Sequence, residues 1–143
     1  MTLEQPEPAP AVETSRQSKA DRVALAWLPA ILYTGLIWWL SSQPLHIEGI
    51  ERFPFQDKGV HFVEYGTLCL TLCFAVYRTW PGRGLRAPLA AAWMTTALGL
   101  LDELHQAFVP GRSSDARDLL ADLLGALTFA FAYHAFRRWR GHA

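Results

Sequence analysis

Charged residues are almost absent from long stretches of this sequence, and cysteine occurs only twice. Cys69 and Cys73 lie one helical turn apart, a spacing at which two residues of one helix seldom form a disulfide. We expect both to be small packing residues that say little about the redox compartment. The chain also lacks the His-Glu-x-x-His pattern and any other metal-ligand spacing of diagnostic strength. With a net charge of zero, we expect no nucleic-acid partner.

Hydrophobic residues are segregated along the chain. They make up 51% of the 143 residues, yet the mean hydropathy is only +0.10 because a polar, proline-containing segment comes first. Four apolar runs follow, at residues 23–40, 59–77, 85–101 (with helical character through 108) and 119–136. A helix rises about 1.5 Å per residue, so about 20 residues cross about 30 Å of hydrocarbon. The runs lack the polar stripe of a soluble helix. They predict an all-α polytopic membrane protein, a bundle of four transmembrane helices.

The remaining segments complete the predicted domain organisation. Residues 1–22 are expected to form a disordered cytoplasmic tail, residues 23–138 the membrane domain, and residues 139–143 a short cytoplasmic end. Acidic residues before the first run, and the length of that run, argue against a secretory signal.

The distribution of charge predicts the orientation. Four spans place both termini and the 78–86 loop on one side of the membrane, and the 41–58 and 109–117 loops on the other. Nine of the thirteen Lys and Arg residues fall on the terminal side, and nine of the thirteen Asp and Glu residues fall on the opposite side. Short loops rich in Lys and Arg stay in the cytoplasm. We therefore expect a bacterial cytoplasmic membrane protein with both termini in the cytoplasm.

The outward side receives two polar segments. In the first, Asp57, His61 and Tyr65 recur at i, i+4 and i+8 and share one helix face, with Glu64 on its flank. In the second, residues 99–126, Asp102 and Gln106 share a face and Glu103 is offset from them. After a Val-Pro-Gly turn, the residues that could cap the fourth helix are Ser113, Ser114 and Asp115. A stripe of carboxylates follows at Asp115, Asp118 and Asp122. Gly99 and Gly125 flank this cluster and are expected to let the third and fourth helices approach closely.

Ionisable groups at membrane depth cost about 3 kcal/mol each, so they mark either a functional site or paired charges. The carboxylates here outnumber the available cations, which are Lys58, Arg112 and Arg117. Some acids should therefore be protonated, bridged or metal-bound. One interpretation is a structural ion-pair network that ties the helices together through Arg112.

Three active interpretations stay open beside it. A metal site suited to zinc or manganese would use His61, Glu64, Glu103, His105 and Asp118. General acid–base chemistry would use Glu103 or Asp102 next to His61, with Arg112 holding a phosphate or carboxylate. Binding without chemistry would grip a polar head group while lipid tails stay in the bilayer. Ion transport is less favoured, because it would need several polar residues continuing toward the cytoplasm, and His134 is the main one.

Three motifs in these segments are DKGVHFVEYG (57–66), LDELHQAFVPGR (101–112) and DLLADLLG (118–125). With them, residues 23–138 resemble the VanZ-like family of small membrane proteins. The resemblance singles out Asp57, Lys58, His61, Tyr65, Asp102, Glu103, Gln106, Arg112 and Asp118. One departure is Asp122, where the family usually has Asn. The family takes its name from low-level resistance to teicoplanin, a lipoglycopeptide that acts at the outer leaflet, and the resemblance implies no particular reaction.

Together these features predict an outward-facing acidic pocket that recognises or modifies a polar-headed amphiphile, such as an envelope lipid or a lipoglycopeptide. Arg112 would hold the anionic head, Glu103 and Asp102 would transfer any proton, and His61 and Tyr65 would orient the head. The remaining residues expected to bind the ligand are Asp57, Lys58, Gln106, Asp118 and Asp122. The sequence does not identify a cofactor, a bound metal or a protein partner.

Overall fold

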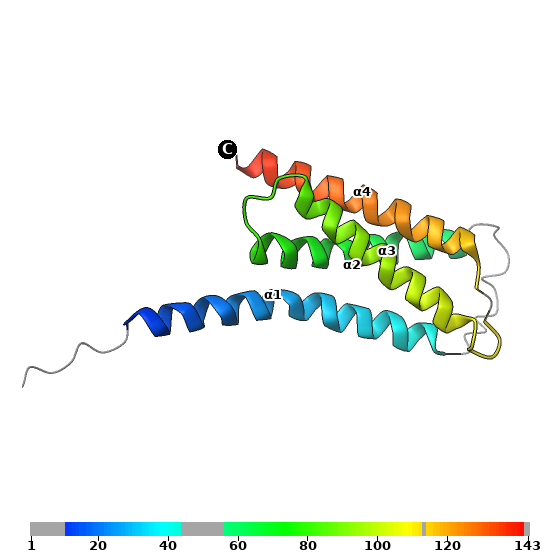
Figure 1. The fold of residues 1–143 in the computed structure, drawn as a ribbon. Helices are drawn as coiled ribbons and strands as arrows, with labels where there is room; N and C mark the ends of the chain where they lie inside the picture. Colours follow the sequence, from blue (N-terminus) through cyan, green and yellow to red (C-terminus); the bar gives the residue numbers. More distant parts are fainter. Residues whose placement is uncertain (1–10, 44–55, 113, 142–143) are drawn as a thin grey trace, which may run out of the picture.

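The computed structural model describes residues 11–43, 56–112 and 114–141, with the side chains of residues 19–43, 57–112 and 114–141. These segments contain four helices and no strand: α1 (Ala11–Ser41), α2 (Gln56–Thr79), α3 (Arg86–Gln106) and α4 (Ala116–Arg140). The prediction of an all-α protein built on four helices is confirmed. Figure 1 shows α2, α3 and α4 packed side by side, with α1 along one flank and its first turns projecting beyond the bundle.

Three helices contain segments long and apolar enough to cross a membrane, namely Lys19–Ser41, Asp57–Thr79 and Ala116–Arg140. The less apolar helix is α3, because its last two turns carry Asp102, Glu103, His105 and Gln106. Its 21 residues nevertheless run along α2 and α4 within the same bundle. By length and composition, the helices make a multi-pass membrane protein.

The start of α1 corrects one expectation. Residues 11–22 were expected to belong to a disordered tail, but the helix begins at Ala11 and continues into the first apolar run. This segment contains no proline or glycine and is rich in good helix formers, so it extends the helix that the apolar run initiates. The three prolines of the tail all precede it. The expectation for residues 1–10 lies outside the described residues.

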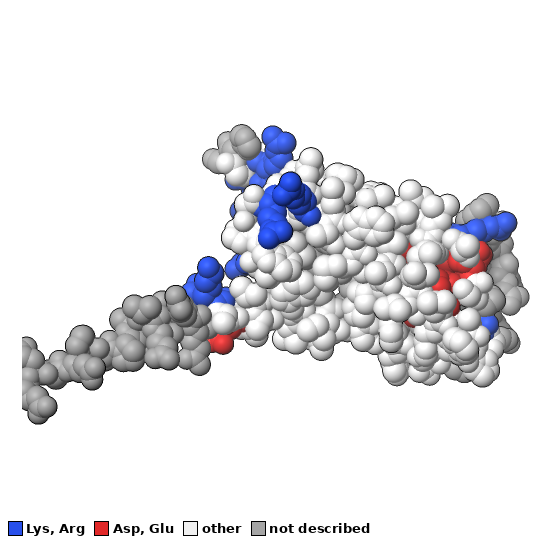
Figure 2. Space-filling view, in the orientation of Figure 1, with Lys and Arg blue, Asp and Glu red and all other residues white. Residues whose placement is uncertain are grey.

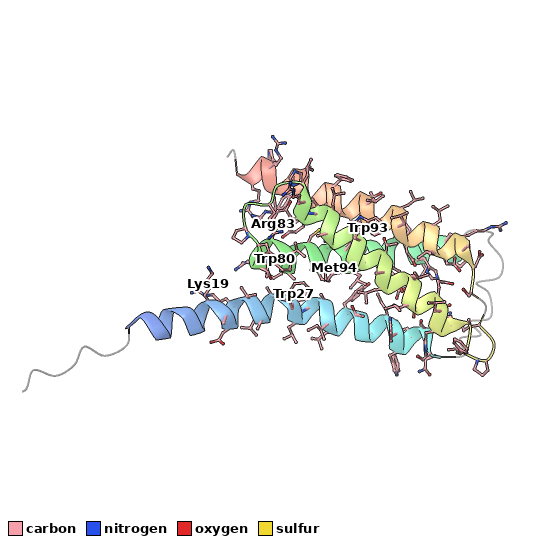
Figure 3. All side chains as sticks on the ribbon, viewed as in Figure 1. Lys19, Trp27, Trp80, Arg83, Trp93 and Met94 are labelled. Atoms are coloured by element: carbon pink, nitrogen blue, oxygen red, sulfur yellow. The ribbon has the colours of Figure 1, made fainter. Side chains whose placement is uncertain are left out.

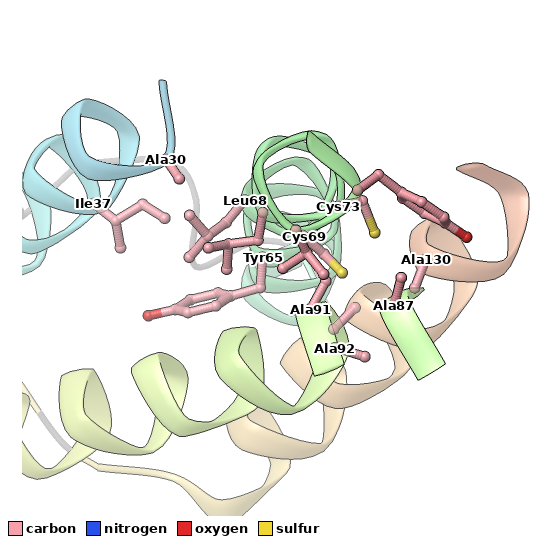
Figure 4. Close-up of a cluster of buried hydrophobic side chains, with 14 residues drawn as sticks. Ala30, Ile37, Tyr65, Leu68, Cys69, Cys73, Ala87, Ala91, Ala92 and Ala130 are labelled. Atoms are coloured by element: carbon pink, nitrogen blue, oxygen red, sulfur yellow. The ribbon is translucent and has the colours of Figure 1, made fainter. Parts of the chain in front are cut away.

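Small residues at the centre of the bundle allow α2 to pack closely against its neighbours. Cys69 and Cys73 of α2 are fully buried as free thiols, beside Ala91 of α3 and Ala130 of α4 (Figure 4). The prediction that both cysteines are packing residues is confirmed. Interior volume is limited when backbones approach, so alanine, glycine and cysteine at these positions permit the contact.

Glycines mark the closest approaches, and one of them differs from expectation. A side chain at Gly99 on α3 would meet Asp122 Oδ2 of α4 at 2.6 Å, as expected for a contact between α3 and α4. A side chain at Gly125, by contrast, would collide with the backbone carbonyl of Phe62. Gly125 therefore permits α4 to approach α2 rather than α3. This contact brings the polar face of α2 against that of α4.

The outer surface of the bundle is apolar, as a lipid-facing surface requires. Leu25, Ile31 and Leu32 of α1 are each more than 60% exposed, and Trp93 of α3 is 75% exposed (Figure 3). Exposing this many large apolar side chains to water would be unfavourable, whereas contact with lipid tails is not.

The two ends of the bundle carry opposite charge. Figure 2 shows most of the visible Lys and Arg toward one end and most of the visible Asp and Glu at the other, where some Lys and Arg also lie. We call "acidic end" the end formed by the C-termini of α1 and α3 and the N-termini of α2 and α4, and "basic end" the opposite one, which includes the α2–α3 turn (residues 80–85). The predicted segregation of charge between the two ends is thus present in the tertiary structure.

Candidate functional site

A tight turn positions the polar residues that follow α3. The backbone N–H of Arg112 donates to the carbonyl of Val109 at 3.1 Å, and Gly111 takes the left-handed conformation with φ of 82°. Proline followed by glycine at the centre of a turn suits this geometry, because glycine adopts positive φ without strain. The turn aims Arg112 back toward α1 and lets α4 begin beside α2.

Asp115 caps α4, as one of the three candidate residues was expected to do. Its carboxylate accepts the backbone N–H of Arg117 at 2.9 Å. This N–H and the Lys58 ammonium lower the pKa of the Asp115 carboxyl, so the cap is ionised at neutral pH.

Lys58, at the start of α2, holds three carboxylates. Its ammonium lies 2.8 Å from Asp57 and 3.0 Å from Asp115, and it also forms a close ion pair with Asp118. Two of these partners belong to α4, so the lysine joins α2 and α4 at the acidic end. Asp57 itself is exposed and pairs only with its sequence neighbour among the described contacts.

His61 lies one turn deeper, between two carboxylates of α4. Its Nδ1 is 3.0 Å from Asp122 Oδ1, and its Nε2 is 4.0 Å from Asp118 Oδ2. The ring stacks on Tyr65, with centroids 6.1 Å apart and planes nearly parallel. The expected shared face of His61 and Tyr65 is therefore present: His61 meets α4, and the ring of Tyr65 lies close to Gly99 of α3.

A second network joins α3 to α1. Asp102 is 2% exposed and accepts hydrogen bonds from Ser41 Oγ at 2.5 Å and from Gln106 Nε2 at 2.9 Å. Asp102 and Gln106 share a face, as their spacing predicted. Ser41 was missed by the sequence argument, although a serine at the end of an apolar run, next to the membrane boundary, was a usable signal.

Arg112 contacts backbone rather than carboxylates. Its Nε–H donates to the carbonyl of Gln43 at 3.3 Å, and Nη2 donates to the carbonyl of Leu40 at 3.2 Å. These carbonyls lie at the C-terminal end of α1, where partial negative charge accumulates. The described contacts therefore contain no ion-pair network that runs through Arg112. Lys58 and His61 pair with the carboxylates instead.

Three buried polar atoms have no hydrogen-bond partner among the described residues. They are Glu103 Oε1, Asp122 Oδ2 and the Tyr65 hydroxyl, on residues that are 4%, 0% and 1% exposed. The other oxygen of Glu103 accepts the backbone N–H of Asp115 at 2.9 Å. Unpaired buried polar atoms are rare in native proteins, and each costs about 1–3 kcal/mol. Their concentration at the acidic end marks it as the candidate site.

Three of the five residues considered for a metal site come together. One ligand atom from each of His61, Glu103 and Asp118 lies within 4.8 Å of the others. His105 is not in this set, because its Nε2 lies 2.9 Å from Ser42 Oγ and its ring stacks on Trp38. Glu64, half-buried on α2, is also outside it.

These observations define a multi-pass membrane protein whose helices converge on a partly unsatisfied acidic site at one end of the bundle. A family model described as VanZ/LLP1 matches residues 5–137, nearly the whole chain. The chain belongs to the VanZ family, which confirms the resemblance drawn from the three motifs. No curated protein and no solved structure matches it.

Proposed function

We propose that the acidic end binds the polar head of a cell-envelope amphiphile while the tails of that amphiphile lie along the apolar surface of the helices. The observation that carries this proposal is the set of unpartnered buried atoms on Glu103, Asp122 and Tyr65. A ligand that donates hydrogen bonds or coordinates these oxygens would offset the cost of burying them. The amphiphile would belong to one of two classes, an anionic envelope lipid or a lipoglycopeptide such as teicoplanin. A lipoglycopeptide would connect the protein with antibiotic resistance.

Within this proposal, Glu103 is the better proton-transfer residue. Both carboxylate oxygens of Asp102 already accept hydrogen bonds from described side chains, whereas Glu103 keeps one oxygen unpartnered. A general base must reach the proton that it abstracts, so a carboxylate with a free oxygen suits the role. If the site is catalytic, Glu103→Gln should abolish turnover while the amphiphile still binds. A pure binding site that contacts the amphiphile directly should tolerate this isosteric change with little loss of affinity.

Arg112 can hold an anionic head while it remains bonded to α1. Its two backbone hydrogen bonds use two of the five guanidinium N–H groups, which leaves three donors for a ligand. The α1 carbonyls would then orient the guanidinium rather than compete with the head group.

Replacing Arg112 by glutamine tests this role. The amide can still donate to one α1 carbonyl, but the charge is lost, so retention of the amphiphile should fall by roughly tenfold or more, as expected when a charge-assisted hydrogen bond worth about 1.5 kcal/mol disappears. Native mass spectrometry of the full chain in mild detergent would show a discrete bound mass in the wild type and its loss in the variant.

The matched control is Arg117→Gln, which removes an exposed arginine from the same end. This variant should retain the amphiphile. Equal retention by both variants would contradict the role of Arg112, and bare protein in every sample would contradict amphiphile binding itself.

A structural role is the second candidate function, and the three carboxylates around Lys58 favour it. The ammonium links α2 to α4 without any ligand, and removing one partner of such a pair is costly because it leaves an unpaired charge. Under this alternative the protein is an accessory membrane protein, and the acidic end is an interhelical ion-pair network.

The proposal also requires the acidic end to face outward from the cytoplasmic membrane, with the basic end and both termini in the cytoplasm. The two native cysteines are fully buried, so single added cysteines can report sidedness. We expect a membrane-impermeant thiol reagent to label Ser114→Cys in intact cells. Both positions are exposed, so either cysteine can react with a reagent that reaches it. Arg140→Cys should be labelled only after permeabilisation, because the basic end is expected to lie in the cytoplasm. The reverse labelling pattern would invert the orientation.

A further inference from the structure

We infer that His61, Glu103 and Asp118 bind a divalent transition-metal ion at the acidic end, and that this ion contacts the anionic head group together with Arg112. The second clause rests on the proposed function, whereas the first stands without it. The three residues come from α2, α3 and α4, so a single ion would join the three packed helices.

The imidazole is arranged as a metal-bound histidine requires. Its Nδ1 is 3.0 Å from Asp122 Oδ1, so an Nδ1–H would be donated to that carboxylate. This tautomer leaves the lone pair of Nε2 directed away from Asp122 and free for a metal. A carboxylate that orients the ligating histidine through its other nitrogen is the usual outer shell of a metal site.

The two acidic ligands lie at a suitable distance. Nε2 of His61 is 4.0 Å from Asp118 Oδ2, and one ligand atom from each of the three residues lies within 4.8 Å of the others. Atoms that share a first-row metal at about 2.0–2.2 Å lie roughly 3–4 Å apart, so a small contraction completes the site. Lys58 occupies the other oxygen of Asp118 and leaves Oδ2 available.

The unpartnered oxygen of Glu103 is independent evidence for a cation site. It is 4% exposed, its Oε2 accepts the backbone N–H of Asp115, and its Oε1 has no described partner. One oxygen of this carboxylate is fixed by a hydrogen bond, and the other is free to coordinate a cation. A mixed nitrogen and oxygen donor set favours zinc or manganese over magnesium or calcium, which prefer oxygen ligands alone.

The charges around the site explain why a metal would serve an anionic ligand. Glu103, Asp118 and Asp122 would repel a phosphate, and Lys58, the cation in contact with Asp118, is already engaged by three carboxylates. A bound divalent ion is the largest local charge and reverses this balance. Three protein ligands also leave open coordination positions for a phosphate or carboxylate oxygen of the head.

The test is direct metal binding by the full chain. Protein purified in mild detergent with a histidine-free affinity tag would be stripped with a chelator. It would then be titrated separately with Mn²⁺ and Zn²⁺, and bound metal would be measured by electron paramagnetic resonance for manganese and by elemental analysis for zinc. The variants are His61→Gln and Glu103→Gln, which keep hydrogen-bonding groups at both positions, with Asp118→Asn should either fail to fold. The matched control is His105→Gln at the same end.

We expect a single ion per chain in the wild type and in His105→Gln, with a rise in the thermal midpoint upon loading. The ligand variants should lose more than the roughly 10- to 100-fold in affinity that removal of an outer-shell partner costs. Equal binding by all variants would place the metal elsewhere and overturn the inference. No binding by the wild type would also overturn it, leaving a protonated His61 between Asp118 and Asp122 as an ion-pair network.

Amphiphile retention by metal-loaded and metal-stripped wild type then separates the two proposals. Retention only in the loaded protein supports both of them. Equal retention in both samples preserves amphiphile binding and overturns the role of the metal in it. Bound metal without any amphiphile preserves the metal site and overturns the proposed function.

Discussion

Replacing Gly125 by alanine is expected to destabilise the bundle by about 3 kcal/mol or more, toward or beyond the upper end of the usual range for overpacking. The added methyl group would collide with the backbone carbonyl of Phe62, and a backbone atom in a helix has no rotamer with which to move aside. The helices α2 and α4 would have to separate. Since His61 neighbours Phe62 and Asp122 lies one turn before Gly125, the contact between His61 and Asp122 should be lost too.

Gly35→Ala is the matched control for this substitution. Gly35 lies on the exposed side of α1 with nothing within 4 Å of the added methyl group. Alanine is the better helix former by about 1 kcal/mol, so this variant should be neutral or slightly more stable. Thermal unfolding of both variants in the same detergent would compare them. Equal stability would contradict the close packing of α2 against α4.

Replacing Asp102 by alanine is expected to cost about 2–6 kcal/mol, because two buried hydrogen bonds from different donors are lost at about 1–3 kcal/mol each. The donors are Ser41 Oγ and Gln106 Nε2. At this end, α1 is otherwise held by the hydrogen bonds from Arg112 and by the contacts of His105 with Ser42 and Trp38, while Trp27 bonds to Thr79 near the basic end. We therefore expect the C-terminal half of α1 to detach first.

Hydrogen exchange should show this local opening as faster exchange near Ser41, with α2 and α4 little changed. Asp57→Ala serves as the control, since this exposed carboxylate shares Lys58 with two others and its loss leaves no buried donor unpaired. If Asp102→Ala were as stable as Asp57→Ala, the hydrogen bonds of Asp102 would contribute little to holding α1.

Several parts of the candidate site were predictable because they depend on local spacing. The turn at residues 109–112, the cap at Asp115 and the stripe from Asp115 to Asp122 follow from proline, glycine and aspartate at definite positions, and the structure has all of them. The shared face of His61 and Tyr65 is likewise a matter of helical periodicity.

The partners of these residues were not predictable in the same way. Arg112 was expected to join an ion-pair network with carboxylates, and it instead donates to two backbone carbonyls at the end of α1. Gly125 was expected to face α3, and it faces α2. His105 was grouped with the metal ligands, and it packs on Trp38. Each error concerns which neighbouring helix a side chain meets.

The sequence by itself determined the number of helices, their approximate bounds, and the segregation of acidic from basic residues, because these depend on hydropathy and on spacing along one helix. It also contained the motifs that identify the VanZ family. Only the tertiary structure decided that α2 is central, that Lys58 and His61 are the residues that meet α4, and that Glu103 keeps an unpaired oxygen. These features depend on how each helix is rotated about its axis. A helix that is apolar on every side has no polar stripe to reveal that rotation.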